Sequence, residues 1–135
     1  MERLSAWAPR VLSILRIVTA LLFIEHGTMK LFAFPEAQHG VTQPMPPFIL
    51  AAAWLETIGG TLLALGLFTR PVAFLLSGEM AIAYWSVHAR ASPWPAVNEG
   101  GEAILYCFIY LYLVFAGGGA WGLDRFIRWG KAPYR

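Results

Sequence analysis

Glu25-His26-Gly27-Thr28-Met29-Lys30 is the stretch that decides how this chain is interpreted. It closes a long apolar run, Val11 to Ile24, and brings a carboxylate, an imidazole and an ammonium group close together. A charged side chain at the centre of a membrane costs about 2.5–3.5 kcal/mol on insertion scales, so it persists where it faces protein or water. The stretch therefore predicts polar side chains gathered inside a membrane protein.

Three further apolar runs carry the same feature. Glu56 interrupts the second run, Glu79 interrupts the third, and Glu102 opens the fourth. The chain has 135 residues, of which 58% are hydrophobic and 13% charged, and its mean hydropathy is +0.56. Soluble domains carry about 25% charged residues, whereas four membrane spans of about 20 residues would use most of this length. We predict an all-α integral membrane four-helix bundle that forms one domain, residues 1–135.

Prolines and glycines separate the predicted elements. The spans are predicted at about residues 9–34, 47–68, 71–88 and 101–116. Apolar and basic residues alternate from Trp121 to Trp129, which favours a short amphipathic helix on the membrane surface. The N-terminal run resembles a signal peptide, but Arg16 lies inside it and no small-residue cleavage site precedes Glu25. We therefore interpret this run as an uncleaved first span.

Basic residues are concentrated on one side of the predicted membrane. That side holds both termini and Arg3, Arg10, Arg70, Arg125, Arg128, Lys131 and Arg135. The other side holds Arg90, with Lys30 near it. The positive-inside rule predicts a multi-pass bacterial inner-membrane protein with both termini in the cytoplasm. The net charge of +2 does not indicate a nucleic-acid partner, and the single cysteine, Cys107, excludes an intrachain disulfide and argues against thiol–disulfide chemistry.

The polar residues of the first two spans fall on defined helix faces. One face of the first span holds Arg16, Thr19, Phe23, His26 and Lys30. Glu25 points elsewhere. We expect Arg16 to snorkel to the inner interface, and Lys30 fits either the outer interface or an internal site. Glu56 interrupts a ladder of small residues spaced four apart, which lets helices approach closely in lipid, so it should face another helix as a structural or a functional carboxylate.

The third and fourth spans add further polar groups. Glu79 lies near the centre of its span, where a glutamate is a functional hypothesis by default, and Tyr84 and His88 lie on the opposite side. We expect Glu56 and Glu79 to face protein, within reach of donors on neighbouring helices. A stripe along the fourth span consists of Glu102, Tyr106 and Tyr110. Ligand binding and plain tyrosine packing explain this stripe about equally well.

Three carboxylates lie at one predicted depth: Glu25, Glu56 and Glu79. Each is about nine residues from the outer end of its span, roughly 13 Å at the helical rise, so the three can converge. A funnel that opens outward is completed above them by His26, Lys30, His88 and Glu102. Clustered carboxylates cannot all ionise cheaply, so some should be protonated or paired with Lys30 or His26. Such groups suit proton relay.

Other chemistries find less support. No predicted span carries the Glu-x-x-His spacing of di-iron bundles, and we assign no metal ligands. No glycine-rich phosphate loop is present, because Gly59-Gly60 and Gly117-Gly118-Gly119 lie within or at the end of predicted spans.

Several motifs together resemble the DoxX family of small four-helix membrane proteins. They are Leu22 to Gly27 with Lys30-Leu31-Phe32, Glu56 to Gly60, Gly66 to Arg70, Gly78 to Ala81, Tyr84 with His88, Trp94-Pro95 and Asn98 to Glu102. The resemblance covers roughly Arg16 to Asp124, and Glu99 is a small departure in the last motif. It implies a relation to the DoxD subunit of thiosulfate:quinone oxidoreductase and association with redox partners. Distant relatives of the fold act as membrane chaperones or assembly factors.

These observations lead to one expected function and one alternative. We expect an inner-membrane subunit of an oxidoreductase system that has a protein partner, with quinone as the candidate cofactor. The candidate catalytic residues are Glu25, His26, Lys30, Glu56 and Glu79, and the candidate cofactor-binding residues are Tyr84, His88, Glu102, Tyr106 and Tyr110. The alternative is a non-catalytic membrane partner that assembles or stabilises another protein. The substrate, the partner and the oligomeric state stay open.

Overall fold

The computed structural model describes residues 2–127, and every regular element within them is helical. The elements are α1 (Glu2–Ser5), α2 (Ala8–Phe32), α3 (Pro47–Leu65), α4 (Thr69–Ala83), the π-helical turn η1 (Tyr84–His88), α5 (Ala89–Ala91), α6 (Gly101–Ala116) and the 3₁₀ turn η2 (Leu123–Arg125). Since α4, η1 and α5 follow one another without a break, they form one helical rod. The predicted all-α fold is confirmed.

Local sequence explains most of the helix ends. Pro9 and Pro47 lie in the first turns of α2 and α3, where a missing N–H costs nothing. Gly66 ends α3 with a φ of 67°, and its N–H bonds back to carbonyls of the last helical turn. Gly117 ends α6 with a φ of 78°. Proline therefore favours the starts of α2 and α3, and glycine the ends of α3 and α6, whereas α2 ends at Ala33.

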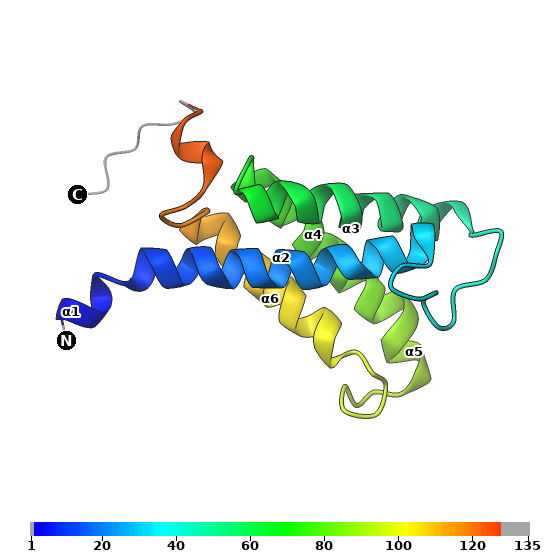
Figure 1. The fold of residues 1–135 in the computed structure, drawn as a ribbon. Coiled ribbons are helices and arrows are strands. Elements are labelled where there is room, and N and C mark those ends of the chain that lie inside the picture. Colours follow the sequence, from blue (N-terminus) through cyan, green and yellow to red (C-terminus); the bar gives the residue numbers. More distant parts are fainter. Residues whose placement is uncertain (1, 128–135) are drawn as a thin grey trace.

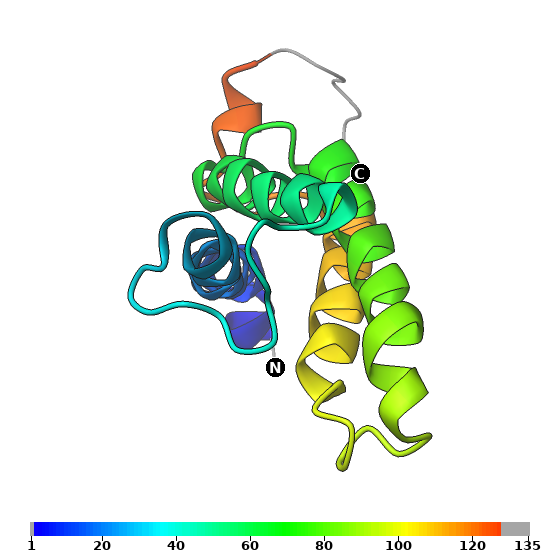
Figure 2. The same cartoon turned by 90° about the vertical axis from the view of Figure 1, so that its right-hand side faces the viewer.

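The helices form two antiparallel pairs. α2 packs mainly against α3 and α4 mainly against α6, while α3 contacts α4 where the two pairs meet. Figure 2 views α2 nearly end-on and α3 obliquely, whereas α4 and α6 run from top to bottom of the view, so the second pair is inclined to the first. Figure 1 places α1, the α3–α4 turn and η2 at one end of the molecule, and the two long loops, residues 33–46 and 92–100, at the other.

Small residues set the close approach of α2 and α3. A Cβ added to Gly27 would collide with the Thr57 side chain and lie 2.8 Å from the carbonyl oxygen of Ala53. A Cβ on Gly60 would lie 2.7 Å from Ile24. The small-residue ladder predicted around Glu56 thus packs against another helix, as small residues do in membrane helix pairs.

The core is built from apolar residues of all four long helices. It contains Ala20, Phe23, Leu63, Val72, Ala73, Leu76, Met80, Ala103, Tyr106, Tyr110 and Leu113. The outer faces are apolar as well: Trp85 and Phe115 are each 72% exposed, and Ile82 is 69% exposed. Soluble monomers rarely carry extensive exposed apolar surface. Such a surface suits contact with lipid.

Judged by length and apolarity, one helix within residues 2–127 meets the requirements for crossing a membrane, namely α3. α6 is apolar but shorter, at 16 residues. α2 has 25 residues but carries Arg16, Glu25 and Lys30. The predicted arrangement of four spans therefore remains a proposal, which is taken up below.

The predicted amphipathic helix from Trp121 to Trp129 is wrong over its described part, which contains only the three-residue turn η2. Tertiary contacts explain the difference. The Asp124 carboxylate accepts hydrogen bonds from the backbone N–H groups of Phe68 (2.6 Å) and Thr69 (2.8 Å), and its own N–H donates to Gly66. These bonds pin the segment across the α3–α4 turn. Arg128 and Trp129 lie outside the described residues.

Candidate functional site

Lys30 and Glu56 form an ion pair between α2 and α3. Lys30 Nζ lies 2.5 Å and 2.6 Å from the two carboxylate oxygens of Glu56. The side chains are 11% and 4% exposed, so the pair is largely shielded from its surroundings. Charge-assisted bonds of this kind are stronger than neutral hydrogen bonds. Of the two positions that the sequence left open for Lys30, the structure favours the internal one.

Glu79 adds a second buried carboxylate from α4. Both of its carboxylate oxygens are buried, and neither has a hydrogen-bond partner within the described part of the chain. Glu56 and Lys30 act on it electrostatically, so we call Lys30, Glu56 and Glu79 the carboxylate cluster. The expectation of a neighbouring donor is confirmed for Glu56 and wrong for Glu79, because the Lys30 ammonium is bound to both oxygens of Glu56. A buried carboxylate without a donor is costly as an anion, so it requires a proton or a donating ligand.

His26 forms a second polar link, between α2 and α6. Its Nε2 lies 3.4 Å from a carboxylate oxygen of Glu102, and the two side chains are 31% and 60% exposed. The ring of Tyr106 stands edge-on to the imidazole, with 6.2 Å between centroids. An exposed pair of this kind contributes about 0–1 kcal/mol. Because both side chains are partly exposed, this pair lies near the surface and outside the buried core.

The tyrosine stripe of α6 is mostly buried in the core. Tyr106 is 5% and Tyr110 0% exposed, and the two rings stack with 5.6 Å between centroids. Phe23 of α2 packs edge-on against both, at 5.2 Å and 5.1 Å. The Tyr110 hydroxyl donates to the carbonyl of Thr19 at 3.2 Å. These contacts favour the packing interpretation of the stripe over the ligand-binding one.

Tyr84 and His88 lie on the π-helical turn η1, and their rings stack at 6.5 Å. His88 Nδ1 lies 2.9 Å from the carbonyl oxygen of Asn98. The buried Asn98 side chain in turn donates to the carbonyl of Ser92 and accepts from the N–H of Gly100. His88 thus belongs to the network that shapes the loop of residues 92–100.

Glu25 does not join the carboxylate cluster. Its side chain is exposed on α2, one position before the half-buried His26. The expected convergence of three carboxylates is therefore wrong for Glu25, because successive residues of a helix point about 100° apart and the face that holds His26 and Lys30 turns inward. The helical-wheel analysis of the sequence did predict that Glu25 points in a different direction from His26 and Lys30.

Arg16 is a residue whose place the sequence analysis missed. It is 0% exposed rather than snorkelling to the interface. Its Nε donates to the carbonyl of Gly118 at 2.8 Å, and its Nη1 donates to the carbonyls of Leu63 and Ala64. It therefore joins α2, the end of α3 and the segment after α6. The position of an arginine inside an apolar run was the sequence signal for a buried residue. Its partners could not be predicted, because they are backbone carbonyls, which every residue possesses.

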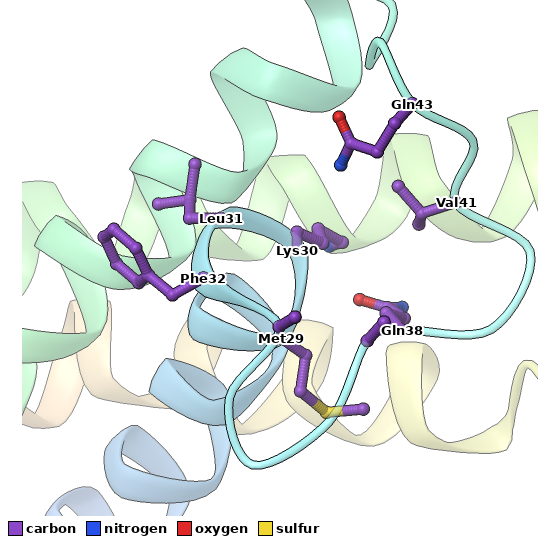
Figure 3. A pocket seen from close by; sticks show the side chains of 9 residues that line it. Met29, Lys30, Leu31, Phe32, Gln38, Val41 and Gln43 are labelled. Carbon is purple, nitrogen blue, oxygen red and sulfur yellow. The ribbon is translucent and has the colours of Figure 1, made fainter.

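A pocket of about 250 Å³ leads to Lys30 from the loop after α2. Figure 3 shows the side chains of Lys30, Gln38, Val41 and Gln43 turned toward one another, with Met29 below them. Gln38 Oε1 is buried and has no hydrogen-bond partner within residues 2–127. The pocket combines apolar walls with two amides and one ammonium group. Sequence reasoning did not find it, because it forms only when the proline-rich loop folds back over α2.

No group of three or more His, Cys, Asp or Glu side chains in the described part of the chain is arranged to hold a metal ion. The described residues do offer proton-carrying and hydrogen-bonding groups: the carboxylate cluster, the pocket beside Lys30 and the pair of His26 with Glu102.

Comparison with known proteins adds relatives to this geometry. The family model of DoxX matches residues 11–89. A relative from Haemophilus influenzae, described as an uncharacterized protein, is 44% identical over 129 residues, which are 93% of this chain and 96% of the relative. The inner membrane protein YphA of Escherichia coli K12 is 32% identical over 128 residues, 87% of this chain and 90% of YphA. No solved structure matches significantly. With more than half of its length matched by the family model and both relatives covered almost end to end, this chain belongs to the DoxX family of membrane proteins.

Proposed function

We propose that this chain is the membrane subunit of an oxidoreductase system and binds the head of a quinone in the pocket beside Lys30. One observation carries the proposal: Lys30 lines the pocket and forms a buried ion pair with Glu56, and a second buried carboxylate, Glu79, has no hydrogen-bond donor within the described residues. Burial of such groups is costly. Ionisable groups kept inside a membrane protein commonly mark ion or proton pathways.

The lining of the pocket suits a quinone head. Small-molecule sites combine apolar walls with a few placed polar groups, and here Met29 and Val41 supply the first while Gln38, Gln43 and Lys30 supply the second. Amide and ammonium N–H groups can donate to the two quinone carbonyl oxygens. A pocket of about 250 Å³ holds the head alone. The apolar tail would lie outside, along exposed side chains such as those of Phe32 (61% exposed) and Phe34 (68%).

The carboxylate cluster supplies the protons in this proposal. Reduction of a quinone to a quinol takes up two electrons and two protons. A redox partner protein provides the electrons. Lys30 lines the pocket and also binds Glu56, so it links the quinone oxygen to the carboxylates. Glu79, which needs a proton or a donor to be buried, is the proton store behind this pair.

Binding is tested by titrating the protein, purified in mild detergent, with a short-chain ubiquinone and following quenching of tryptophan fluorescence. Saturable binding is expected. Gln38→Leu and Gln43→Leu should each weaken it about tenfold, because one lost hydrogen bond of about 1.4 kcal/mol changes the affinity by that factor. His39→Leu is the matched control, since His39 is exposed in the same loop and does not line the pocket. Its affinity should equal that of the intact protein.

Two further measurements separate the parts of the proposal. Affinity purification in mild detergent, with proteins and lipids identified by mass spectrometry, should recover a redox protein. In that complex Glu79→Gln should bind quinone normally but reduce it more slowly, because the proton store is lost. Absence of saturable quinone binding, both for the chain alone and for the complex, would end the quinone proposal.

The proposal includes four membrane passes with both termini in the cytoplasm. The basic residues near the termini, the helical hairpins and the exposed apolar faces support this arrangement. With Cys107 replaced by alanine, an impermeant thiol reagent added to intact cells should label His39→Cys and Ser92→Cys. Arg3→Cys and Lys131→Cys should react only after the cells are opened. Labelling on the reverse sides would refute the outward-opening pocket.

A second candidate function is a non-catalytic membrane partner that stabilises another protein. The observation in its favour is that several candidate residues satisfy one another: Lys30 with Glu56, His26 with Glu102, and Tyr110 with the carbonyl of Thr19. Such pairs hold helices together without any ligand. A co-purified complex whose activity survives both Glu79→Gln and Gln38→Leu would support this candidate.

A further inference from the structure

A second pocket, of about 820 Å³, lies at the other end of the molecule from the pocket beside Lys30. It forms where the start of α2, the α3–α4 turn and the segment after α6 meet, at the end of Figure 1 that holds α1 and η2. Its volume falls within the range of small-molecule sites. Nothing in the function proposed above uses it.

Thr69 places an unsatisfied polar group in this pocket. The residue lines the pocket and is 1% exposed, and its Oγ1 has no hydrogen-bond partner within residues 2–127. Buried hydroxyl groups are almost always hydrogen-bonded to protein, water or a ligand. The same threonine begins α4, so its surroundings also include the positive end of a helix dipole. A ligand that brings an acceptor oxygen would complete this site.

The charges of the pocket wall favour an anion. Arg70 and Arg125 both line it, and they hold their places through bonds to the carbonyls of Val114 (3.1 Å) and Ala120 (2.7 Å). The acidic residue of the wall, Asp124, is already bound to two backbone N–H groups of the α3–α4 turn. Arginine is well suited to phosphate, because its planar group can donate two parallel hydrogen bonds.

An apolar stripe leads away from the pocket along α6. Tyr112 lines the pocket and is 57% exposed. Phe108 and Phe115 lie four residues before it and three after it, so all three share one helix face. They are 65% and 72% exposed. The site thus joins a cationic pocket to an exposed apolar surface, which matches a molecule that has an anionic head and long apolar chains.

We infer that this pocket binds the phosphate group of an anionic phospholipid, with the Thr69 hydroxyl and the guanidinium groups of Arg70 and Arg125 as donors and the acyl chains lying on the stripe of Phe108, Tyr112 and Phe115. The inference rests on the proposed membrane arrangement, which puts this end at the cytoplasmic surface. Basic pockets between membrane helices on that side bind anionic head groups. It does not depend on quinone binding.

The test is native mass spectrometry of the full chain in detergent, titrated separately with phosphatidylglycerol and phosphatidylcholine of identical acyl chains. Phosphatidylglycerol is expected to bind saturably and at least tenfold more tightly. Thr69→Val and Arg125→Gln should each weaken its binding about tenfold, and Arg70→Gln with Arg125→Gln should abolish the preference. Arg90→Gln, an exposed basic residue at the opposite end, is the matched control and should change nothing.

Three outcomes overturn the inference. Equal binding of the two lipids would show that the head group is not recognised. Saturable binding of inorganic phosphate that is as tight as that of the lipid would assign the site to a soluble anion. An unchanged preference in Thr69→Val and Arg125→Gln, both confirmed as folded by circular dichroism, would place the lipid elsewhere. Failure of the quinone titration leaves each of these readouts untouched, so the two proposals fail separately.

Discussion

Replacing Glu56 by leucine is expected to lower the free energy of unfolding in mixed micelles by about 3–5 kcal/mol, because removing one partner of a buried ion pair leaves the other charge unpaired. The remaining charge is the Lys30 ammonium, whose side chain is 11% exposed. Glu25→Leu is the matched control. It removes the same group from an exposed position of α2, where substitutions usually change stability by no more than about 0.5 kcal/mol.

Two further variants test whether the stability loss of Glu56→Leu comes from the unpaired charge of Lys30 and whether Glu79 has a structural role. Lys30→Met combined with Glu56→Leu should recover most of the lost stability, since apolar replacements of buried ion pairs are often neutral or stabilising. Glu79→Leu should be neutral or stabilising, because its carboxylate oxygens have no hydrogen bond to lose within residues 2–127. A loss from Glu79→Leu as large as that from Glu56→Leu would mean that Glu79 is a structural carboxylate and not a proton store.

Arg16→Lys is expected to lower the free energy of unfolding by about 3 kcal/mol or more, although it keeps the charge. Arg16 donates to the carbonyls of Leu63, Ala64 and Gly118. A lysine ammonium is a compact group that cannot span these acceptors as a planar guanidinium does. Each hydrogen bond to a charged group contributes about 1.5–3 kcal/mol, so the loss of two accounts for the effect.

Arg10→Lys is the control for this prediction. Arg10 is exposed on the first turn of α2, with its guanidinium 5.1 Å from the ring of Trp7. Its replacement should change stability by no more than about 0.5 kcal/mol. If Arg16→Lys behaves like Arg10→Lys in chemical denaturation monitored by tryptophan fluorescence, the buried arginine does not hold the three segments together.

The helices and the interior position of two glutamates followed from the sequence because their causes are local. Apolar runs of sufficient length specify α2, α3 and α6 wherever they pack, helped by proline at the starts of α2 and α3 and glycine at the ends of α3 and α6. A carboxylate inside such a run is costly when it faces lipid, so the helix is expected to rotate until the carboxylate faces protein. This predicted the inward position of Glu56 and Glu79. The small residues around Gly60 predicted a close helix contact for the same reason.

Which polar group meets which was decided only by the tertiary structure. Helices packed with a different rotation or inclination would have given Lys30 another partner than Glu56, and His26 another than Glu102. The acceptors of Arg16 and the donors to Asp124 are backbone groups, which every residue possesses and no sequence pattern marks. Both pockets depend on segments that fold back over helix ends. The sequence by itself determined that charged groups lie inside a helical protein. Their pairing, the exposure of Glu25 and the burial of Glu79 without a hydrogen-bond donor among residues 2–127 came from the relative positions of four helices. The physical reason is that distances between side chains far apart in the chain are fixed only once the helices are packed.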